Sequence, residues 1–471
     1  MNTMAIPEVT ERSEALFNPE LLKKFDINGP RYTSYPSADH FHKKFGEPNY
    51  LAALKRVGLS QDPVSLYFHI PFCANICYYC GCNKIITKDH ARSAKYIDYL
   101  AKEIKMVHQA IGAQKKIPVT QLHWGGGTPT FLSHTEMTEL MDHIHQYFDL
   151  LPGGEYSIEI DPRRVTEDDI ALLATLGFNR ISLGVQDFNP SVQEAIHRIQ
   201  SIEETLAVMN WSRRYGFQSR NIDLIYGLPK QTPQSFQQTV DSVIEMAPER
   251  VSVYNYAHLP HIFKPQRRIF EADLPPAADK LDMLSNTISQ LTDTDYVFIG
   301  MDHFAKPDDE LAIAQKAGKL HRNFQGYSTQ AECDLLAFGV SSIGKVSDCY
   351  SQNMKTIDEY YDTIDRGHLP VLRGLQLDQD DLIRRELIGV IMCQFRLNTK
   401  SFADSHGIDF SEYFADELIE LSALEDAGLV EFNTHEIIVP VKGRLLVRRV
   451  AMAFDRHLKE SQSLGTYSKV L

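Results

Sequence analysis

The chain has few of the features that mark membrane, nucleic-acid-binding or disulfide-rich proteins. Among its 471 residues, no apolar run approaches the roughly 20 residues that a helix needs to cross a bilayer. Its 48 Lys and Arg against 62 Asp and Glu give a formal net charge of −14, so no basic excess is available for binding nucleic acid. Seven cysteines are too few for a disulfide scaffold. We therefore predict a folded protein of two or three domains that binds neither membrane nor nucleic acid.

The N-terminus also lacks the pattern of a targeting segment. Glu8, Glu11 and Glu14 stand where a signal peptide would carry positive charge and an apolar core. We therefore expect a cytoplasmic location, where thiols that cluster in the sequence indicate a metal or redox site rather than disulfides. No heptad run predicts a coiled-coil dimer, and a monomer is expected.

Short apolar or β-branched runs alternate with longer segments of helical periodicity. The runs are residues 65–70, 119–124, 156–161, 180–185, 221–226 and 251–256. The helical segments are residues 94–108, 136–148, 167–176, 201–215 and 233–246. This alternation predicts an α/β fold with a parallel sheet. Six such units, rather than the eight of a closed barrel, predict an incomplete (β/α)6 barrel.

The chain outside these units divides into two flanking regions and an extension. Residues 1–60 are interpreted as an N-terminal arm, either ordered on the body of the protein or a plain linker. Residues 61–370 form the predicted catalytic domain, with the barrel core at about 65–270. Residues 371–471 predict helices around one hairpin with a turn near Asn433, typical of a mostly helical, winged-helix-like C-terminal cap domain. A packing role is favoured for this domain because the chain is acidic.

Four of the seven cysteines lie within ten residues, after the first predicted strand. Cys73, Cys77 and Cys80 have the spacing Cys-x3-Cys-x2-Cys, and Cys82 follows. Structural zinc is disfavoured, because no second cysteine pair and no suitably spaced histidine pair follows. Three thiolates suit a cubane iron–sulfur cluster with one open iron position, whereas a simple electron carrier would use Cys82 as a fourth ligand. Both alternatives remain open from the spacing alone.

Polar and glycine-rich segments fall at the ends of the predicted strands. The glycine run 125–127 follows the second strand, Glu159 and Asp161 lie in the third, and Gln186 follows the fourth. Ligands of parallel α/β sheets bind at the carboxyl ends of the strands. We therefore expect these residues to form one site with the cysteine loop.

Several further segments carry a resemblance to a known family. They are Gly29-Pro-Arg-Tyr-Thr-Ser-Tyr-Pro36, the ending Cys80-Gly-Cys82, and residues 124–129, 184–187, 221–229, 300–304 and 323–327. Together with the cysteine spacing, they resemble the oxygen-independent coproporphyrinogen III oxidases of the radical S-adenosylmethionine superfamily. The resemblance extends from about residue 20 to the C-terminus.

The resemblance implies a set of cofactors. Cys73, Cys77 and Cys80 would hold one [4Fe-4S] cluster, and Cys82 would lie near it without binding iron. The family is understood to bind two S-adenosylmethionine molecules, only one of them on the cluster. The implied contacts with S-adenosylmethionine are Tyr67, Tyr79, Gly126, Gly127, Thr128, Glu159, Gln186, Arg198, Asp223, Ala257 and Ile343.

The resemblance also implies a reaction in haem biosynthesis. A 5′-deoxyadenosyl radical would abstract hydrogen from two propionates of coproporphyrinogen III, whose oxidative decarboxylation to vinyl groups gives protoporphyrinogen IX. No protein acid or base is required, and an electron donor such as a flavodoxin or ferredoxin is implied. The alternative is a haem-binding chaperone of the same superfamily. The Cys-Gly-Cys ending and the long arm favour the oxidase.

A substrate with four propionates needs cations gathered locally on this acidic chain. The candidate substrate contacts are Arg31, Lys84, Arg163, Arg164 and Arg322, with His321 beside them and with Phe324, Gln325 and Tyr327 as uncharged neighbours. Ordinary surface charge, or core packing for the aromatic residues, is the competing interpretation.

Overall fold

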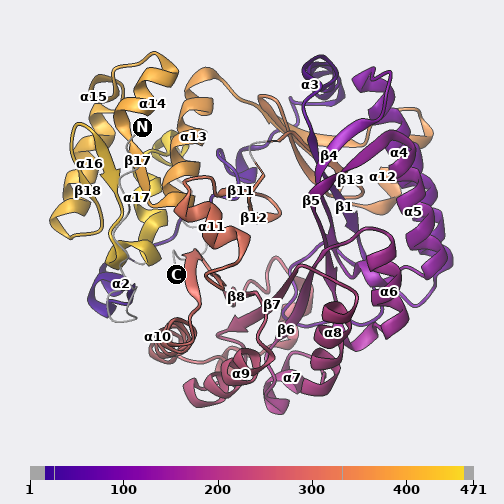
Figure 1. Ribbon diagram of the computed structural model, residues 1–471, viewed down its shortest axis with the longest axis horizontal. Coiled ribbons are helices and arrows are strands. Elements are labelled where there is room, and N and C mark those ends of the chain that lie inside the picture. Colours follow the sequence, from indigo (N-terminus) through magenta and orange to yellow (C-terminus); the bar gives the residue numbers. More distant parts are fainter. Residues whose placement is uncertain (1–15, 26, 331–332, 461–471) are drawn as a thin grey trace.

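The computed structural model describes residues 16–25, 27–330 and 333–460. The first 15 residues of the predicted arm and the last 11 of the predicted cap domain lie outside the described residues. The centre of the molecule is a curved 12-stranded sheet in the order β16-β15-β14-β13-β1-β4-β5-β6-β7-β8-β10-β9 (Figure 1). The two ends of this order are not joined, so the predicted incomplete barrel is confirmed.

All six predicted strands form, and each pairs in parallel with the next. They are β1 (Val64–Ile70), β4 (Ile117–Gly126), β5 (Phe148–Ile160), β6 (Arg180–Gln186), β7 (Ser219–Tyr226) and β8 (Arg250–Asn255). The five predicted helices are α4 (Ala91–Ile111), α5 (His134–Tyr147), α6 (Glu167–Thr175), α8 (Ile202–Arg214) and α9 (Pro233–Met246). Four of them begin where a hydroxyl side chain caps the first turn: Ser133, Thr166, Ser201 and Thr232.

The six parallel strands have one apolar and one polar face. Leu66, Leu122 and Leu183 are fully buried in the main core. The alternate residues form polar contacts across the strands, such as Ser65 Oγ to Gln121 Oε1 at 3.0 Å and Asn221 Nδ2 to Ser182 Oγ at 2.9 Å. Because side chains of a strand alternate between faces, the barrel interior is polar and suited to a ligand.

Six further strands extend the sheet beyond the predicted units. On one side, β13 (Leu335–Phe338) is parallel to β1 and is followed by antiparallel β14 (Ile343–Val346), β15 (Cys349–Asn353) and β16 (Val371–Gln376). On the other side lie β10 (His303–Ala305) and β9 (Val297–Gly300). These strands were not predicted from the sequence, because they are short and not separated by regular helices. Helices α10 (Ala277–Asp293), α11 (Glu310–Lys316) and α12 (Ile357–Asp365) lie between them, and the short helix α7 (Pro190–Ala195) follows β6.

A small hairpin closes the barrel interior from the amino ends of the strands. It consists of β11 (His321–Asn323) and β12 (Gly326–Ser328). Asn323 Nδ2 donates to Gln121 Oε1 at 3.3 Å, and Ser328 Oγ donates to Glu155 Oε2 at 3.0 Å. The opening toward ligands is therefore at the carboxyl ends of the strands.

The described part of the N-terminal arm packs on the body of the protein. It contains two helices that were not predicted, α2 (Pro19–Phe25) and α3 (Glu47–Ser60). Arg448 donates to the backbone carbonyl groups of Gly29 and Pro30, and the Tyr32 hydroxyl donates to Asp455 Oδ2 at 2.9 Å. The described part of the arm is therefore ordered on the body of the protein and is not a plain linker.

The C-terminal region is mostly helical, as predicted. Its helices are α13 (Gln379–Gln394), α14 (Thr399–His406), α15 (Phe410–Tyr413), α16 (Ala415–Asp426), α17 (Val447–Ala453) and α18 (Arg456–Glu460). The predicted hairpin is β18 (Glu431–Phe432) with β19 (Glu436–Ile438), and β17 (Arg396–Asn398) joins it. The proposed domain boundary at residue 371 stays a prediction, since β16 belongs to the large sheet.

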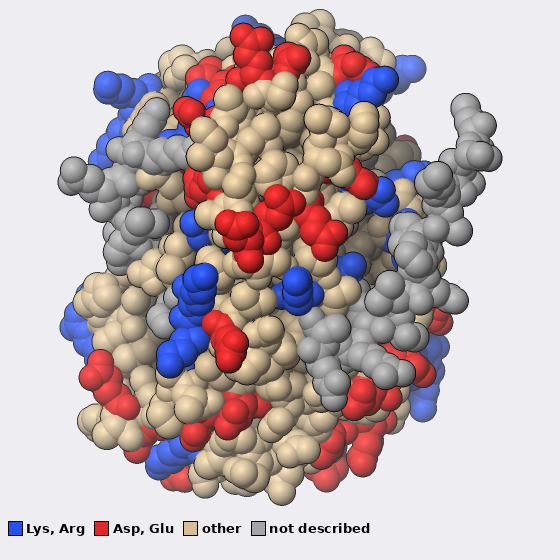
Figure 2. Space-filling model, turned by 90° about the vertical axis from the view of Figure 1, so that its left-hand side faces the viewer, with Lys and Arg blue, Asp and Glu red and all other residues tan. Residues whose placement is uncertain are grey.

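The face that carries these helices shows no single dominant charge. Its described Lys and Arg side chains lie among Asp and Glu side chains rather than in one continuous patch (Figure 2). In the described part of the chain, no helix combines the length and apolar character needed to span a bilayer.

Candidate active site

The cysteine loop lies at the carboxyl end of β1. It leaves β2 (Phe72–Cys73) and returns at β3 (Ile85–Ile86), which pairs with β2 in parallel. A hydrogen bond of 3.0 Å from Thr87 N to Cys73 O fixes its base. Cys73, Cys77, Cys80 and Cys82 all line one pocket of about 310 Å³, together with residues at the carboxyl ends of β4 to β8. The cysteine loop and the carboxyl ends of the strands therefore line one pocket, as predicted.

Two of the thiols lie against hydrogen-bond donors. Cys77 Sγ is 3.6 Å from Nη1 of Arg198 and 3.8 Å from Nη2 of Arg163, and Thr128 Oγ1 donates to Cys73 Sγ at 3.4 Å. Asp161 holds both arginines, with Arg163 Nη2 at 2.6 Å and Arg198 Nη2 at 3.2 Å from its carboxylate oxygens. Positive charge next to a thiol favours the thiolate, the form that binds metal.

The three cysteine thiols differ in their local environment. Burial raises the pKa of the Cys73 thiol to about 11. A hydrogen bond from the Cys82 thiol lowers the pKa of Cys80 to about 6. Lys84 Nζ adds positive charge beside Cys80, donating to its backbone carbonyl oxygen at 2.9 Å. The surroundings of Cys80 therefore favour the thiolate more than those of Cys73 do.

The donor set fits an iron–sulfur cluster better than a zinc ion. No three His, Cys, Asp or Glu side chains among residues 16–25, 27–330 and 333–460 are arranged to hold a single metal ion. His69, at the end of β1, already has partners: its Nδ1 lies 3.0 Å from the Tyr67 hydroxyl and its Nε2 lies 2.9 Å from Asn83 O. Three thiols around an open pocket leave room for a larger group with its own bridging atoms.

The glycine run supports the cysteine loop by close backbone contact. Gly127 N donates to Ile70 O at 2.8 Å, and a Cβ on Gly127 would lie 2.7 Å from the Pro71 carbonyl carbon. Gly126 has φ +112°, and a Cβ there would lie 2.5 Å from the His69 ring. Larger residues would push the end of β4 away from the loop. The run is therefore required by packing as well as by any ligand.

Besides Asp161, two carboxylates line the pocket in different environments. Burial opposes the charge of Glu159, but hydrogen bonds from His123 and from Gly126 N (3.1 Å) lower its pKa. Burial raises the pKa of Asp223 to about 6, although Ser182 Oγ donates to its Oδ2 at 2.7 Å. Glu159 is therefore a stable acceptor for ligand hydroxyl or ammonium groups, whereas Asp223 is poised between its two protonation states near pH 6.

Arg198 and Gln186 both line the pocket, and Gln186 is the last residue of β6. Arg198 Nη2 donates to Gly184 O, and its Nε is buried without a hydrogen-bond partner. Burial opposes its charge, yet Tyr79 and Asp161 raise its pKa above the ordinary value. Gln186 has φ +70°, an unfavourable conformation for a residue with a side chain. An unpaired buried donor and a strained residue are both typical of a binding site.

Eight of the eleven predicted S-adenosylmethionine contacts line this pocket: Tyr79, Gly126, Gly127, Thr128, Glu159, Gln186, Arg198 and Asp223. The other three do not. Tyr67 lies deeper on β1 with its ring stacked on His123 at 5.9 Å. Ala257 is an exposed residue after β8, and Ile343 begins β14 near Phe324 and Tyr350.

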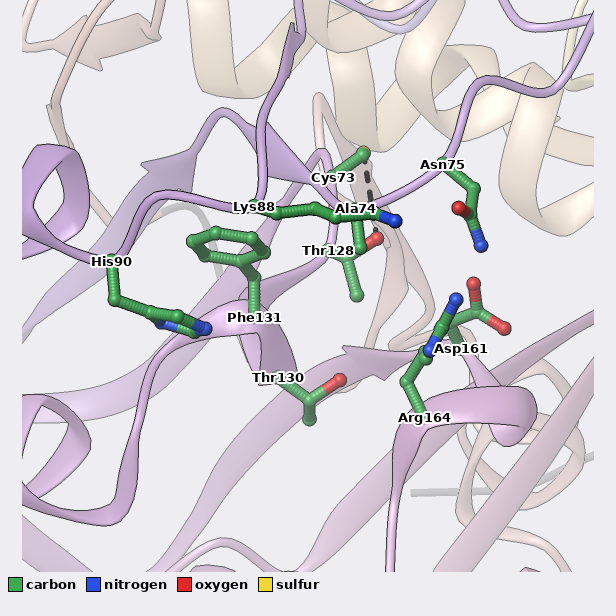
Figure 3. Close-up of a pocket in the computed structure, with 10 residues that line it drawn as sticks. All are labelled: Cys73, Ala74, Asn75, Lys88, His90, Thr128, Thr130, Phe131, Asp161 and Arg164. Atoms are coloured by element: carbon green, nitrogen blue, oxygen red, sulfur yellow. Dashed lines mark hydrogen bonds between the residues drawn. The ribbon is translucent and has the colours of Figure 1, made fainter.

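The candidate propionate ligands beside the cysteine loop fall into two places. Lys84 and Arg163 line the same pocket as the thiols. Arg164 is exposed and lines two other pockets, which adjoin the thiol pocket (Figure 3). Arg164 itself does not line the thiol pocket.

The remaining candidates gather where the arm meets the β11–β12 hairpin. Arg31 forms an ion pair with Asp302, and Arg322 Nη1 donates to Arg31 O at 2.9 Å. Arg322 and Phe324 line a cavity of about 620 Å³, together with His321. Gln325 Nε2 donates to Leu66 O at 3.4 Å, and its Oε1 is buried without a partner.

Buried polar atoms without partners extend this group into the barrel. They belong to Arg322, Gln325, Tyr327 and His303. The His303 ring lies 5.2 Å from Tyr327 and 5.9 Å from Tyr254, and Tyr254 lines the thiol pocket. Such unpaired groups indicate a polar ligand in this region.

Ser182 and Tyr254 are among the residues of the thiol pocket that were not predicted from the sequence. Both could have been found from their strands, because Ser182 lies in β6 four residues before Gln186 and Tyr254 is the residue before the last of β8. Asp161 was expected at the site, but its pairing with both Arg163 and Arg198 could not be read from the sequence.

Comparison with known proteins agrees with this geometry. The pattern of the Radical SAM superfamily matches residues 67–243, and that of the HemN C-terminal domain matches residues 377–446. Oxygen-independent coproporphyrinogen III oxidase of Pseudomonas aeruginosa is 49% identical over 457 residues, which are 97% of this chain and 99% of that protein. The Escherichia coli protein of that name is 48% identical over 96% of this chain and 98% of its own length.

The fold is also that of a solved relative. The structure of coproporphyrinogen III oxidase (HemN) from Escherichia coli, a radical SAM enzyme, covers 94% of this chain and 99% of its own, with 47% identity and a TM-score of 0.89. This chain therefore belongs to the family of oxygen-independent coproporphyrinogen III oxidases, within the radical SAM superfamily.

Proposed function

We propose that this chain is an oxygen-independent coproporphyrinogen III oxidase. It converts two propionate side chains of coproporphyrinogen III to vinyl groups and yields protoporphyrinogen IX, a step of haem biosynthesis. The observation that carries the proposal is the single pocket in which three cysteine thiols meet Glu159 and Arg198 at the carboxyl edge of a polar barrel. The near-complete coverage of oxidases with 48–49% identity supports the same activity.

As a member of the radical SAM superfamily, the chain uses a [4Fe-4S] cluster and S-adenosylmethionine. We infer that Cys73, Cys77 and Cys80 hold one cluster and that Cys82 lies outside its ligand set, donating to the Cys80 thiol. The eight contacts of the thiol pocket receive the S-adenosylmethionine on the open iron. Tyr67, Ala257 and Ile343 do not line that pocket, and a second S-adenosylmethionine molecule accounts for predicted contacts as far apart as Gln186 and Ile343.

When bound, the cluster and S-adenosylmethionine supply a 5′-deoxyadenosyl radical that takes one hydrogen atom from the β-carbon of a propionate. The chain's part is binding and exclusion of water. Glu159 accepts hydrogen bonds from ligand hydroxyl or ammonium groups, and Arg198 donates its unpaired Nε–H toward a carboxylate. Each propionate also releases carbon dioxide, and one electron passes to a one-electron acceptor. These steps require no protein acid or base.

The substrate lies in the polar barrel between the thiol pocket and the β11–β12 hairpin. Arg31 and Arg322 receive propionates, and Phe324 and Gln325 contact the macrocycle. The unpaired polar atoms of Arg322 and Gln325 support this placement. Lys84 and Arg163 line the thiol pocket and lie apart from this group. The chain acts as a monomer and takes electrons from a flavodoxin or ferredoxin.

An anaerobic assay tests the proposal directly. The reconstituted protein receives dithionite, S-adenosylmethionine and coproporphyrinogen III, and we expect methionine release together with protoporphyrinogen IX. Methionine release without vinyl product would contradict the substrate assignment. Stable haem binding without decarboxylation would instead support a haem-binding chaperone. Cys82→Ser serves as the matched variant, and it should keep the cluster that Cys73→Ser loses.

A further inference from the structure

The cysteine loop also lines a second pocket, which adjoins the thiol pocket and shares Cys73, Thr128 and Asp161 with it. This pocket has a volume of about 380 Å³ and is lined by Cys73, Asn75, Lys88, Arg164 and residues near them. Figure 3 shows Lys88 and Arg164 among the side chains around this pocket, with Arg164 beside Asp161. A further pocket of about 280 Å³ shares Asn75 and Arg164 and is extended by His197 and Ile199.

The lining of these two pockets is cationic, although the chain as a whole carries −14. Lys88, Arg163 and Arg164 contribute positive charge. Among the described residues that line the pockets, Asp161 supplies the carboxylate, and it is bound by Arg163 and Arg198. The exposed side chains Lys88 and Arg164 therefore present positive charge to the solvent beside the cysteine loop.

The cationic surface continues over the loop itself. The Tyr78 ring, between two of the cysteines, stacks on the His197 ring at 4.9 Å with an interplanar angle of 8°. The Arg268 guanidinium lies 5.0 Å from the centre of the same ring and donates to the Tyr78 hydroxyl at 3.1 Å. Lys88, Arg164, His197 and Arg268 thus surround the outer side of the loop, and we call them the outer patch.

Large apolar side chains accompany the outer patch. Ile199, two residues after His197, is 62% exposed, and Phe270, two residues after Arg268, is 71% exposed. Protein interfaces combine apolar anchors of this kind with a charged rim that steers the partner. The outer patch therefore has the composition of a docking surface.

We propose that the outer patch docks an acidic protein that carries single electrons, and that electrons enter the site here. The proposal rests on the proposed function, because the reductive cleavage of S-adenosylmethionine consumes one electron from outside the chain. The reduced carrier loses one electron, and the group held by Cys73, Cys77 and Cys80 gains it. The interior pocket is occupied by S-adenosylmethionine during this step, which leaves the outer side of the loop as the close approach for a carrier.

Charge reversal separates docking from catalysis. In the holoenzyme variant Lys88→Glu/Arg268→Glu, we expect the Kd for a flavodoxin, measured by calorimetry at low ionic strength, to rise about tenfold or more. The difference from the unaltered protein should shrink as salt is added. Turnover driven by the flavodoxin should fall by a similar factor, whereas turnover driven by dithionite should stay within about twofold.

Two controls keep the test decisive. Lys400→Glu reverses an exposed charge on the C-terminal region and should change neither binding nor turnover. If the double variant loses its iron, the single variant Lys88→Glu replaces it. Unchanged flavodoxin affinity with unchanged flavodoxin-driven turnover would overturn the docking surface. Absence of dithionite-driven turnover in the unaltered protein would refute the proposed function instead, and the calorimetric comparison would still decide the outer patch.

Discussion

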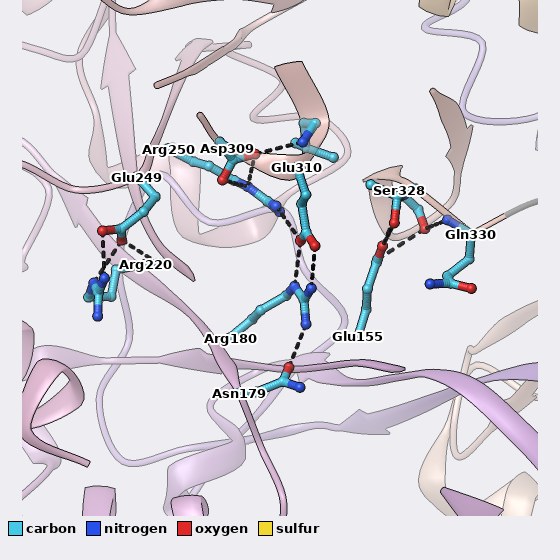
Figure 4. Close-up of polar contacts among 12 residues, drawn as sticks. Glu155, Asn179, Arg180, Arg220, Glu249, Arg250, Asp309, Glu310, Ser328 and Gln330 are labelled. Carbon is cyan, nitrogen blue, oxygen red and sulfur yellow. Dashed lines mark hydrogen bonds and ion pairs between the residues drawn. The ribbon is translucent and has the colours of Figure 1, made fainter. Parts of the chain in front are cut away.

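The two ends of the parallel strands use the same kinds of charged residues for opposite purposes. At the amino ends, Arg180 Nη2 lies 2.6 Å from Glu310 Oε2, and Arg250 binds both Asp309 (2.9 Å) and Glu310 (2.6 Å) (Figure 4). At the carboxyl ends, Arg198 has an unpaired Nε, and Asp223 faces an open pocket. The charged groups of this amino-terminal network pair with one another, whereas those at the carboxyl ends keep polar atoms available to a ligand.

This difference shows why charge composition alone does not locate a site. Arg220, beside the amino-terminal network, is fully engaged by Glu249 and by Phe217 O. In the folded protein, the amino-terminal pairs contribute stability, whereas the carboxyl-terminal groups are held at some cost until a ligand pairs them. Substitutions at the two ends should therefore separate stability from activity.

The largest effect is expected from removing a thiol. Cys77→Ser replaces a soft ligand that faces Arg198 and Arg163, so the iron–sulfur cluster and the activity should be lost completely. Iron content and visible absorption after anaerobic reconstitution measure this. Cys333→Ser, at a cysteine far from the loop in the sequence, should keep both. Full cluster content in Cys77→Ser would show that Cys77 is not a ligand.

At the amino ends, Glu310→Ala should destabilise the fold without changing the chemistry. It leaves the largely buried guanidinium of Arg180 without its bidentate partner, and we expect the free energy of unfolding to fall by about 2–3 kcal/mol. Denaturant unfolding measures this. The exposed pair of Arg396 and Glu436 provides the control, since Arg396→Ala should cost less than about 1 kcal/mol. An equal fall in the free energy of unfolding in both variants would show that the buried network stabilises the fold no more than an exposed ion pair does.

At the carboxyl ends, Asp223→Asn should stabilise the fold and impair ligand binding. Because burial raises the pKa of Asp223 to about 6, the folded state holds the proton more tightly than the unfolded chain. The contribution of this group to stability is therefore full below its unfolded pKa and is lost as the pH rises to about 6. The Asn variant lacks this loss, so it should be more stable at pH 7, by about 1–3 kcal/mol, while binding S-adenosylmethionine more weakly.

The pH dependence sharpens the comparison. Burial opposes the charge of Glu310, but Arg180 and Arg250 hold its pKa below the usual value. Its contribution is therefore lost only as the pH falls through that lowered pKa, in the opposite direction to Asp223. Unfolding curves of both variants between pH 3 and 7 measure these trends, and parallel pH profiles would contradict the assignment.

A smaller effect is expected from Asp161→Asn. The amide keeps the shape of the side chain but weakens the hold on Arg163 and Arg198 beside Cys77. Loss of a supporting group of this kind costs about tenfold in affinity or activity. Calorimetric titration of the reconstituted protein with S-adenosylmethionine should show a Kd raised about tenfold at full iron content. An unchanged Kd would mean that Asp161 has no role in positioning these arginines.

Much of the central fold was predictable from periodicity. The six strands and five helices of the barrel carry long alternating patterns, and β1 and α4 lie within a few residues of their predicted positions. The strands β13–β16 were not predicted, since β13 has only four residues and its pairing with β1 is a contact distant in sequence. Helix α3 was also missed, because its N-cap is Gly46 without a side-chain cap.

The site was predictable in its residue types but not in its pairings. Eight contacts inferred from family resemblance meet in one pocket, because their strands end at a common edge. Arg163 was expected to bind a propionate, yet the structure pairs it with Asp161 against Cys77. Arg164, the next residue, lines the adjoining pockets and not the thiol pocket. Such differences depend on turn geometry after β5, which a sequence does not specify.

Mössbauer spectroscopy of the anaerobically purified protein, with and without S-adenosylmethionine, tests the central claim most directly. The claim is that Cys73, Cys77 and Cys80 hold a [4Fe-4S] cluster whose fourth iron is open to S-adenosylmethionine. The account predicts one iron site whose parameters shift when S-adenosylmethionine is added, in the unaltered protein and in Cys82→Ser alike. Four iron sites that do not respond to S-adenosylmethionine, or a protein without iron, would contradict it.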